Sequence, residues 1–117
     1  MSDRAPRTDE ERDFRRQLVQ LANEMLAGRM SFFEGAPQVL SLRSKVGGID
    51  DFDPDFVPFV VIDSETDHLP LKAQQSLWSP TALQRLAPEY VRTEEWAAAF
   101  APAACRNLIA RFSKHDS

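Results

Sequence analysis

Residues 50–68 have the sequence DDFDPDFVPFVVIDSETDH, in which seven carboxylates surround a bulky apolar run. No lysine or arginine occurs between Lys45 and Lys72. Unbalanced charge is typical of a disordered segment, but this one also carries enough apolar surface to anchor it on a core. We therefore expect residues 56–62 to pack on the rest of the domain and to hold the neighbouring acidic side chains in place.

The secondary structure of the apolar run is open between two alternatives. The sequence Asp53-Pro54-Asp55 is typical of a helix start, with a side-chain cap, a proline in the first turn and an acid favoured by the helix dipole. This pattern predicts a short helix over 54–62. The β-branched residues 60–62 are equally typical of a buried strand, and Pro58 suits the interior of neither element.

The chain before this tract predicts two helices. Thr8 and Ser31 are each followed three residues later by a glutamate, which is the pattern of a capping box. The first box begins a helix over about 9–27, where apolar residues recur at helical spacing. The second begins a helix that ends near Val46, and Pro37 weakens its first turns.

The chain after this tract predicts further helices beyond an irregular stretch at 63–78. Ser79-Pro80 begins a short helix over 80–87. Pro88 begins a last, long helix with a clean apolar stripe, which Pro102 is expected to kink or to divide.

Together these elements predict an all-α fold. We expect a compact bundle of four to five helices with an irregular acidic segment around 47–79. A chain of 117 residues suits a single domain. That domain is expected over 8–113, with flexible ends at 1–7 and 114–117.

The composition disfavours several classes of protein. A net charge of −4 disfavours nucleic-acid binding, which needs clustered lysine and arginine. Arg12, Arg15 and Arg16 alternate with acids and are expected on a solvated face. No apolar stretch approaches the roughly 20 residues of a membrane span, and the N-terminus does not resemble a signal peptide. With Cys105 as its one cysteine, the chain is expected to be cytoplasmic.

Recognisable catalytic motifs are also missing from the sequence, including the serine-nucleophile, phosphate-loop, paired-cysteine and zinc-protease patterns. Cys105 lies on an apolar stripe and is expected to be buried and inert, and His115 lies close to the C-terminus. The alternating acids at 51–55 resemble a calcium loop, but Phe56 and Ile62 replace the required glycine and bidentate glutamate. We therefore expect neither enzymatic activity nor a cofactor.

Residues 63–68 are the candidate functional segment, with three interpretations. They form a solvated turn in which Ser64, Thr66 and Asp67 bond local amides, a surface for a basic partner, or a site for a divalent metal or small ligand. Basic residues within the fold that could balance their charge are Arg43, Lys45, Lys72 and Arg106. The candidate binding residues are Asp63, Ser64, Glu65, Thr66, Asp67, His68, Arg43 and Trp78.

Two further side-chain types bear on this segment. His68 and the neighbouring carboxylates are residue types that bind metal ions or carry out acid–base catalysis. A pocket at this segment would also be lined by Arg43 and Arg106. Trp78 and Trp96 are either core aromatics or anchors of an interface.

One part of the sequence resembles a known group. The run Phe59–Leu71, followed by Trp78-Ser79-Pro80 and Ala82-Leu83, is similar to a segment of small uncharacterised bacterial proteins. Leu42-Arg43 and Ala104-Cys105-Arg106 are similar as well. The resemblance covers about half of the chain. It implies a bacterial origin and no particular activity, because no function is established for the group.

These observations favour a non-enzymatic protein-binding module, of the inhibitor or immunity kind, that presents residues 50–68 to a basic partner. Neither nucleic acid nor membrane is an expected partner. The alternative is a helical protein that binds a small molecule or divalent metal at Asp63–His68. A homo-oligomer through the C-terminal helix is a third possibility, because the alanine-rich stretch 96–101 allows close helix approach.

Overall fold

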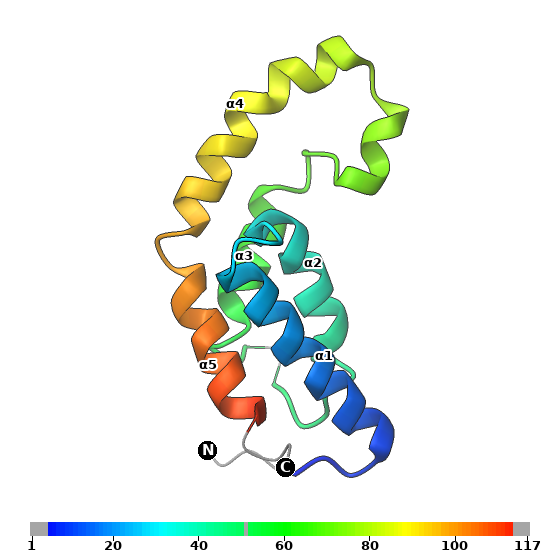
Figure 1. The fold of residues 1–117 in the computed structure, drawn as a ribbon, viewed down its shortest axis with the longest axis vertical. Helices are drawn as coiled ribbons and strands as arrows, with labels where there is room; N and C mark the ends of the chain where they lie inside the picture. The colour runs from blue at the N-terminus through cyan, green and yellow to red at the C-terminus, as the bar shows by residue number, and fades with distance from the viewer. Residues whose placement is uncertain (1–4, 51, 114–117) are drawn as a thin grey trace.

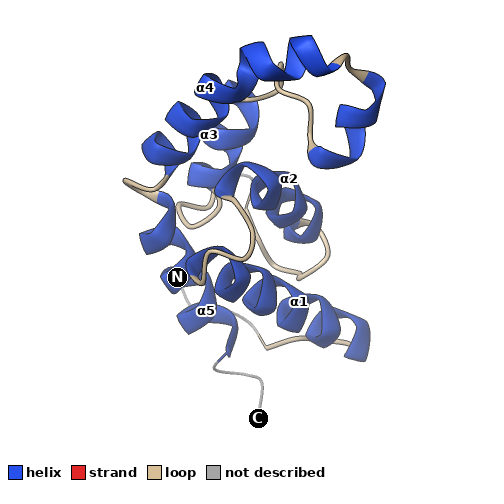
Figure 2. Cartoon of the chain, turned by 45° about the horizontal axis from the view of Figure 1, so that its top comes forward, coloured by secondary structure: helices blue, strands red, loops and turns tan. Residues whose placement is uncertain are grey.

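The computed structural model describes residues 5–50 and 52–113. Of the predicted flexible ends, 1–7 and 114–117, residues 1–4 and 114–117, which include His115, lie outside the described residues, as does Asp51. Within the described part the chain forms helices and no strand (Figure 1, Figure 2), so the predicted all-α fold is confirmed, with six helices in place of four to five. They are α1 (Asp9–Leu26), α2 (Phe32–Arg43), α3 (Val57–Glu65), the 3₁₀ helix η1 (Lys72–Leu77), α4 (Pro80–Ala97) and α5 (Ala101–Ser113).

Three predicted helix starts are confirmed by their caps. The side-chain hydroxyls of Thr8, Ser31 and Ser79 each accept a hydrogen bond from the amide three residues later, at 3.0, 3.0 and 3.1 Å. Each bond satisfies one amide that has no partner within its helix. The first helix also ends where expected, at Leu26 and before Gly28, whose φ is +78°.

The core lies between α1, α2, α3 and α5. α5 runs beside α1 (Figure 1), and the apolar stripes of these two helices face each other in one buried cluster. The predicted stripe of the C-terminal helix is therefore an internal surface. Its buried members are Ala101, Ala104, Cys105, Leu108 and Phe112, and those of α1 are Leu18, Leu21, Ala22 and Met25.

The central apolar run is a helix and not a strand. Phe56, Phe59 and Ile62 are fully buried, at the spacing of one helix face, while Val57 and Val61 are partly exposed. α3 begins at Val57 and ends at Glu65, later than the predicted 54–62. Pro58 explains the shift, because proline is tolerated only in the first turn, where its missing amide hydrogen is not needed.

The predicted boundary at Pro88 is wrong. α4 continues through Pro88, and the chain breaks instead at 98–100, just before Pro102. An interior proline destabilises a helix by about 3 kcal/mol. Contacts of Tyr90 and Glu94 with other elements hold the turns that follow it, and this packing overrides the local preference. The alternative in which Pro102 divides the long helix is confirmed.

Two other predicted boundaries also differ. α2 continues through Pro37 and ends at Arg43, sooner than the predicted Val46. The stretch 63–78 is only partly irregular, because α3 extends to Glu65 and η1 occupies Lys72–Leu77.

Part of the chain extends away from the core. The molecule measures 48 × 27 × 25 Å because η1 and the N-terminal half of α4, residues 72–88, project beyond the other helices (Figure 1, Figure 2). We call this segment the arm. η1 has no buried residue, and α4 has only Ala97. α4 is therefore held by its C-terminal half, where it packs against α2.

The main polar contact between α4 and the core is made by Glu94. Its two carboxylate oxygens accept hydrogen bonds from the amides of Phe32 and Phe33, at 2.9 and 2.8 Å. With the cap from Ser31 to Glu34, all of the first three helical amides of α2 are satisfied. A carboxylate at this position is also favoured by the helix dipole.

We expect the Glu94→Ala variant to lose about 1–2 kcal/mol of unfolding free energy, because two amides lose their acceptor. Glu94→Gln should lose less, since its amide oxygen still accepts. Urea denaturation measures both. The matched control is Glu95→Ala, an exposed neighbour expected to change stability by at most about 0.5 kcal/mol. Equal losses for Glu94→Ala and Glu95→Ala would contradict the assigned role.

Candidate functional site

The first half of the acidic tract is structural. Nη1 of Arg111, in the last turn of α5, donates to Asp53 at 2.8 Å and to Asp55 at 3.0 Å. The Asp53 side chain is only 5 % exposed and also accepts the Asp55 amide at 2.9 Å. Two of the seven carboxylates are thus neutralised within the fold and are not available to a partner.

The basic residue that balances these acids was not among the expected ones. Arg43, Lys45, Lys72 and Arg106 were the candidates, whereas Arg111 makes the pair. The reason is the packing of the adjacent Phe112 edge-on against Phe56, with ring centroids 6.2 Å apart. This contact carries Arg111 to the loop that precedes α3.

Arg15 corrects a second expectation, since it does not lie on a solvated face. It is 3 % exposed, and its Nε donates to the carbonyl oxygen of Val46 at 2.8 Å. Its guanidinium also lies 5.4 Å from the Phe112 ring. Arg15 therefore ties the start of the α2–α3 loop to the core. Residue 15 lies on the apolar side of α1, and this position predicts burial. The alternating charges around it had instead predicted a solvated face.

In the second half of the acidic tract, residues 63–68, most side chains face solvent, including Ser64, but Thr66 is buried. Glu65, Asp67 and His68 are exposed and Asp63 is half-buried. Among the described residues, neither Asp63 nor Glu65 forms an ion pair. The turn interpretation expected side chains that accept from local amides, but the Thr66 hydroxyl instead donates to the Ile62 carbonyl oxygen at 2.6 Å and closes the end of α3.

His68 links this segment to α4. Its Nε2 contacts a carboxylate oxygen of Glu89, and its Nδ1 lies 4.0 Å from Asp67. Asp63, Glu65 and His68 do not converge, because they border different hollows. In the described part of the chain, no group of three or more histidine, cysteine, aspartate or glutamate side chains could hold a metal ion.

One hollow brings several candidate residues together. It has a volume of about 260 Å³ and is bordered by Asp67 and His68 and by Leu77 and Trp78. Leu77 is 85 % exposed and Trp78 is 42 % exposed. We call it the acidic–aromatic hollow. Of the two aromatic interpretations, the structure places Trp78 at the surface, beside carboxylate Asp67.

Two predicted pocket residues lie elsewhere. Arg43 is at the C-terminal end of α2, about 15 Å along the helix from Phe33, which borders a hollow with Asp63 and Thr66. Arg106 is exposed on α5, and neither arginine borders the hollows formed by residues 63–68. These arginines do not complete a pocket with the acidic segment.

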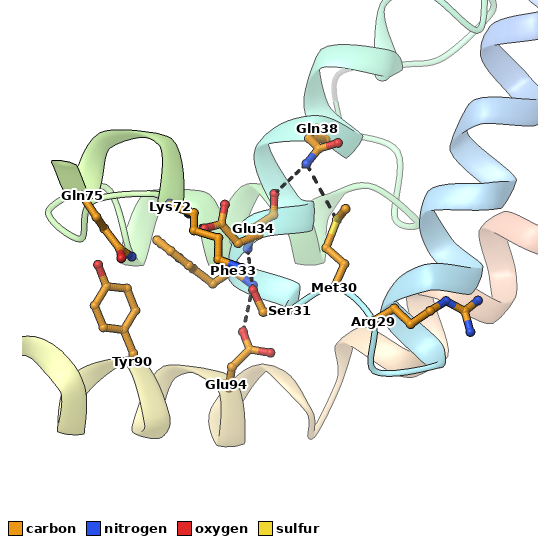
Figure 3. A pocket seen from close by; sticks show the side chains of 10 residues that line it. All are labelled: Arg29, Met30, Ser31, Phe33, Glu34, Gln38, Lys72, Gln75, Tyr90 and Glu94. Atoms are coloured by element: carbon orange, nitrogen blue, oxygen red, sulfur yellow. Dashed lines mark hydrogen bonds between the residues drawn. The ribbon is translucent and has the colours of Figure 1, made fainter.

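A second cavity, which was not predictable from the sequence, has a volume of about 470 Å³ and lies between the start of α2, η1 and α4 (Figure 3). Gln75 from η1 and Tyr90 from α4 point toward each other across it. The Tyr90 hydroxyl donates to the Pro70 carbonyl oxygen at 2.5 Å, and burial raises the pKa of this phenol. The residues that line the cavity are Arg29, Met30, Ser31, Phe33, Glu34, Gln38, Lys72, Gln75, Tyr90 and Glu94.

The alanine-rich stretch 96–101 is partly internal. Ala97 and Ala101 are buried in the core, and Trp96 packs edge-on against Phe100 with ring centroids 5.0 Å apart. Only Ala98 and Ala99, in the turn between α4 and α5, are exposed small residues. This arrangement gives the predicted oligomer through the C-terminal helix no additional support.

Comparisons of the chain with protein-family models, with curated proteins and with solved structures found no match. The resemblance of Phe59–Leu71 to small bacterial proteins therefore stays a prediction. No helix among residues 5–50 and 52–113 is long and apolar enough to cross a membrane.

We expect Asp53→Ala to lower the unfolding free energy by about 3 kcal/mol, because it leaves the largely buried Arg111 with only part of its pairing. Asp55→Ala should cost less, since Asp53 remains and Asp55 is 22 % exposed. Urea denaturation provides the values. Asp50→Ala is the control, because Asp50 accepts a local amide without an arginine partner. A loss for Asp53→Ala no greater than that of the control would show that the ion pair is not stabilising.

The buried Cys105 thiol is expected to be unreactive, because burial raises its pKa to about 11. Iodoacetamide at pH 8 should modify the unfolded protein and spare the folded one. Between about pH 9 and 11 the unfolded thiol ionises while the folded thiol keeps its proton. Unfolding free energy should therefore fall as pH rises through this window, and less steeply in Cys105→Ala. Equal labelling of folded and unfolded protein would contradict the assignment.

Proposed function

We propose that this protein is a non-enzymatic protein-binding module, of the inhibitor or immunity kind, that presents an acidic surface to a basic partner. The surface consists of residues 63–68 and Trp78, with the buried Thr66 as an internal support of its exposed neighbours. The observation that supports it most is the acidic–aromatic hollow, in which Asp67 and His68 lie beside the exposed Leu77 and Trp78. Carboxylates without an internal partner and a surface tryptophan are the two components that such an interface needs.

The two components have different physical roles. Exposed or half-buried carboxylates at Asp63, Glu65 and Asp67, none of which pairs with a lysine or arginine among the described residues, attract a basic partner before contact and raise the association rate. An aromatic side chain that becomes buried on binding slows dissociation, and tryptophan is among the residues that contribute most in this way. Leu77 adds apolar area next to Trp78. The proposed partner surface therefore carries lysine or arginine around an apolar side chain.

The proposed setting is a bacterial cytoplasm, as expected from the sequence. The metal-binding alternative has less support, because Asp63, Glu65 and His68 border three different hollows, and no more than two ionisable side chains of residues 63–68 border any one of these. No step of the proposed role requires a cofactor.

The test begins with capture of a partner from the native host and its purification. We expect the triple variant Asp63→Asn, Glu65→Gln, Asp67→Asn to slow association by about tenfold or more in low salt, and to lose most of the salt dependence. Trp78→Ala should instead speed dissociation. Stopped-flow or surface-binding kinetics separate these effects.

The control has the same change in net charge on a distant surface. It is Asp9→Asn, Glu10→Gln, Asp13→Asn, all at exposed positions of α1. Its association rate should stay within about threefold of wild type. Equal slowing by both triple variants would show that the effect comes from net charge alone and not from this surface. Unchanged association rates in the 63–67 variant would eliminate the proposed surface.

A further inference from the structure

The 470 Å³ cavity between α2, η1 and α4 is a separate candidate site (Figure 3). Its volume falls within the range of small-molecule pockets, about 300–1,000 Å³. Part of its wall is apolar: the rings of Phe33 and Tyr90 are edge to face, with centroids 5.3 Å apart, and Met30 lines the cavity away from Tyr90. The rest is polar and charged. The cavity therefore suits a ligand with one apolar part and one strongly polar part.

Two of the four charged groups in the wall already have partners. Arg29 is bonded to Glu24 at 2.6 Å and lies at an exposed position. Both carboxylate oxygens of Glu94 accept amides of α2. These two groups are already bonded within the protein. They act on a ligand through their charge more than through direct hydrogen bonds.

Glu34 and Lys72 are the two charged groups that retain free capacity. One oxygen of Glu34 accepts the backbone amide of Lys72 at 2.7 Å, and this bond holds η1 against the start of α2. In the part of the chain that the structure describes, neither side-chain charge forms an ion pair. The cavity wall thus carries a carboxylate and an ammonium group on two adjacent elements, with the second carboxylate oxygen and the amine open to a ligand.

The charges restrict the class of ligand. An anion would be attracted by Lys72 but repelled by Glu34 and Glu94. A cation would be attracted by these two carboxylates but repelled by Lys72 and Arg29. A molecule that carries both charges and no net charge satisfies both groups at once. The α-amino acid zwitterion is the smallest common molecule of this type, and an apolar side chain would match Phe33 and Met30.

We propose that this cavity binds a free α-amino acid with an apolar side chain. Its carboxylate pairs with Lys72, its ammonium group with Glu34, and its side chain packs on Phe33 and Met30. This inference uses none of the residues of the proposed protein-binding surface, so each can fail without the other.

The test is calorimetric titration of the full chain with leucine, methionine and phenylalanine, followed by amide-shift mapping by NMR. We expect binding of at least one of them, with shifts at Ser31, Lys72 and Gln75. The N-acetyl and the amide derivatives of the same amino acid each lack one charge, and they should bind at least tenfold more weakly. Equal binding of the derivatives, or no binding of any of the three amino acids at millimolar concentration, would overturn the proposal.

Variants test the assigned contacts. Glu34→Gln keeps an acceptor for the Lys72 amide but removes the charge, and Lys72→Gln removes the ammonium group while leaving its backbone in place. Each should weaken binding at least tenfold with the melting temperature little changed. Arg29→Gln, at the exposed rim, should bind like wild type. Loss of affinity in Arg29→Gln alone would refute the assigned geometry.

Discussion

The bidentate contact of Glu94 with the first two amides of α2 holds α4 against the core. α4 buries almost no apolar surface of its own, so packing alone cannot orient it. The start of a helix offers several unpaired amides and a favourable dipole, and a carboxylate from sixty residues away satisfies two of them. This contact sets the distance between α2 and α4. The 470 Å³ cavity lies in that space. η1, the first part of the arm, forms part of its wall.

The acidic tract shows how long-range pairing divides a feature that is continuous in the sequence. Asp53 and Asp55 are withdrawn into an ion pair with Arg111, while Asp63, Glu65 and Asp67 stay at the surface. The apolar face of α3, with Phe56, Phe59 and Ile62, separates the two halves and is buried. The expectation that this run anchors the acids is therefore met. The consequence is that Asp53 and Asp55 are not available to a partner, whereas Asp63 and Glu65 in the last turns of α3 and Asp67 beyond it are accessible.

Local signals were sufficient for part of this structure. The hydroxyl caps at Thr8, Ser31 and Ser79 and the periodic stripes of α1 and α5 depend on neighbours within one or two turns, and their predictions hold. The failures have a common cause. Continuation of α4 through Pro88, the burial of Arg15 and the choice of Arg111 as partner all depend on contacts between distant elements. Periodicity carries no information about such contacts. Of the candidate site, the exposed acids and Trp78 were predictable, whereas the second cavity was not, because three elements form it.

The distribution of aromatic residues has a spectroscopic consequence. Phenylalanines 56, 59 and 112 fill the core, whereas both indoles of the chain, Trp78 and Trp96, are partly exposed and belong to the α4 side of the molecule. Tryptophan fluorescence therefore reports on the environment of that side and changes little with the packing of the core. Far-ultraviolet dichroism, in contrast, averages over all helices. The two signals observe different regions, and their comparison distinguishes detachment of α4 from melting of the bundle.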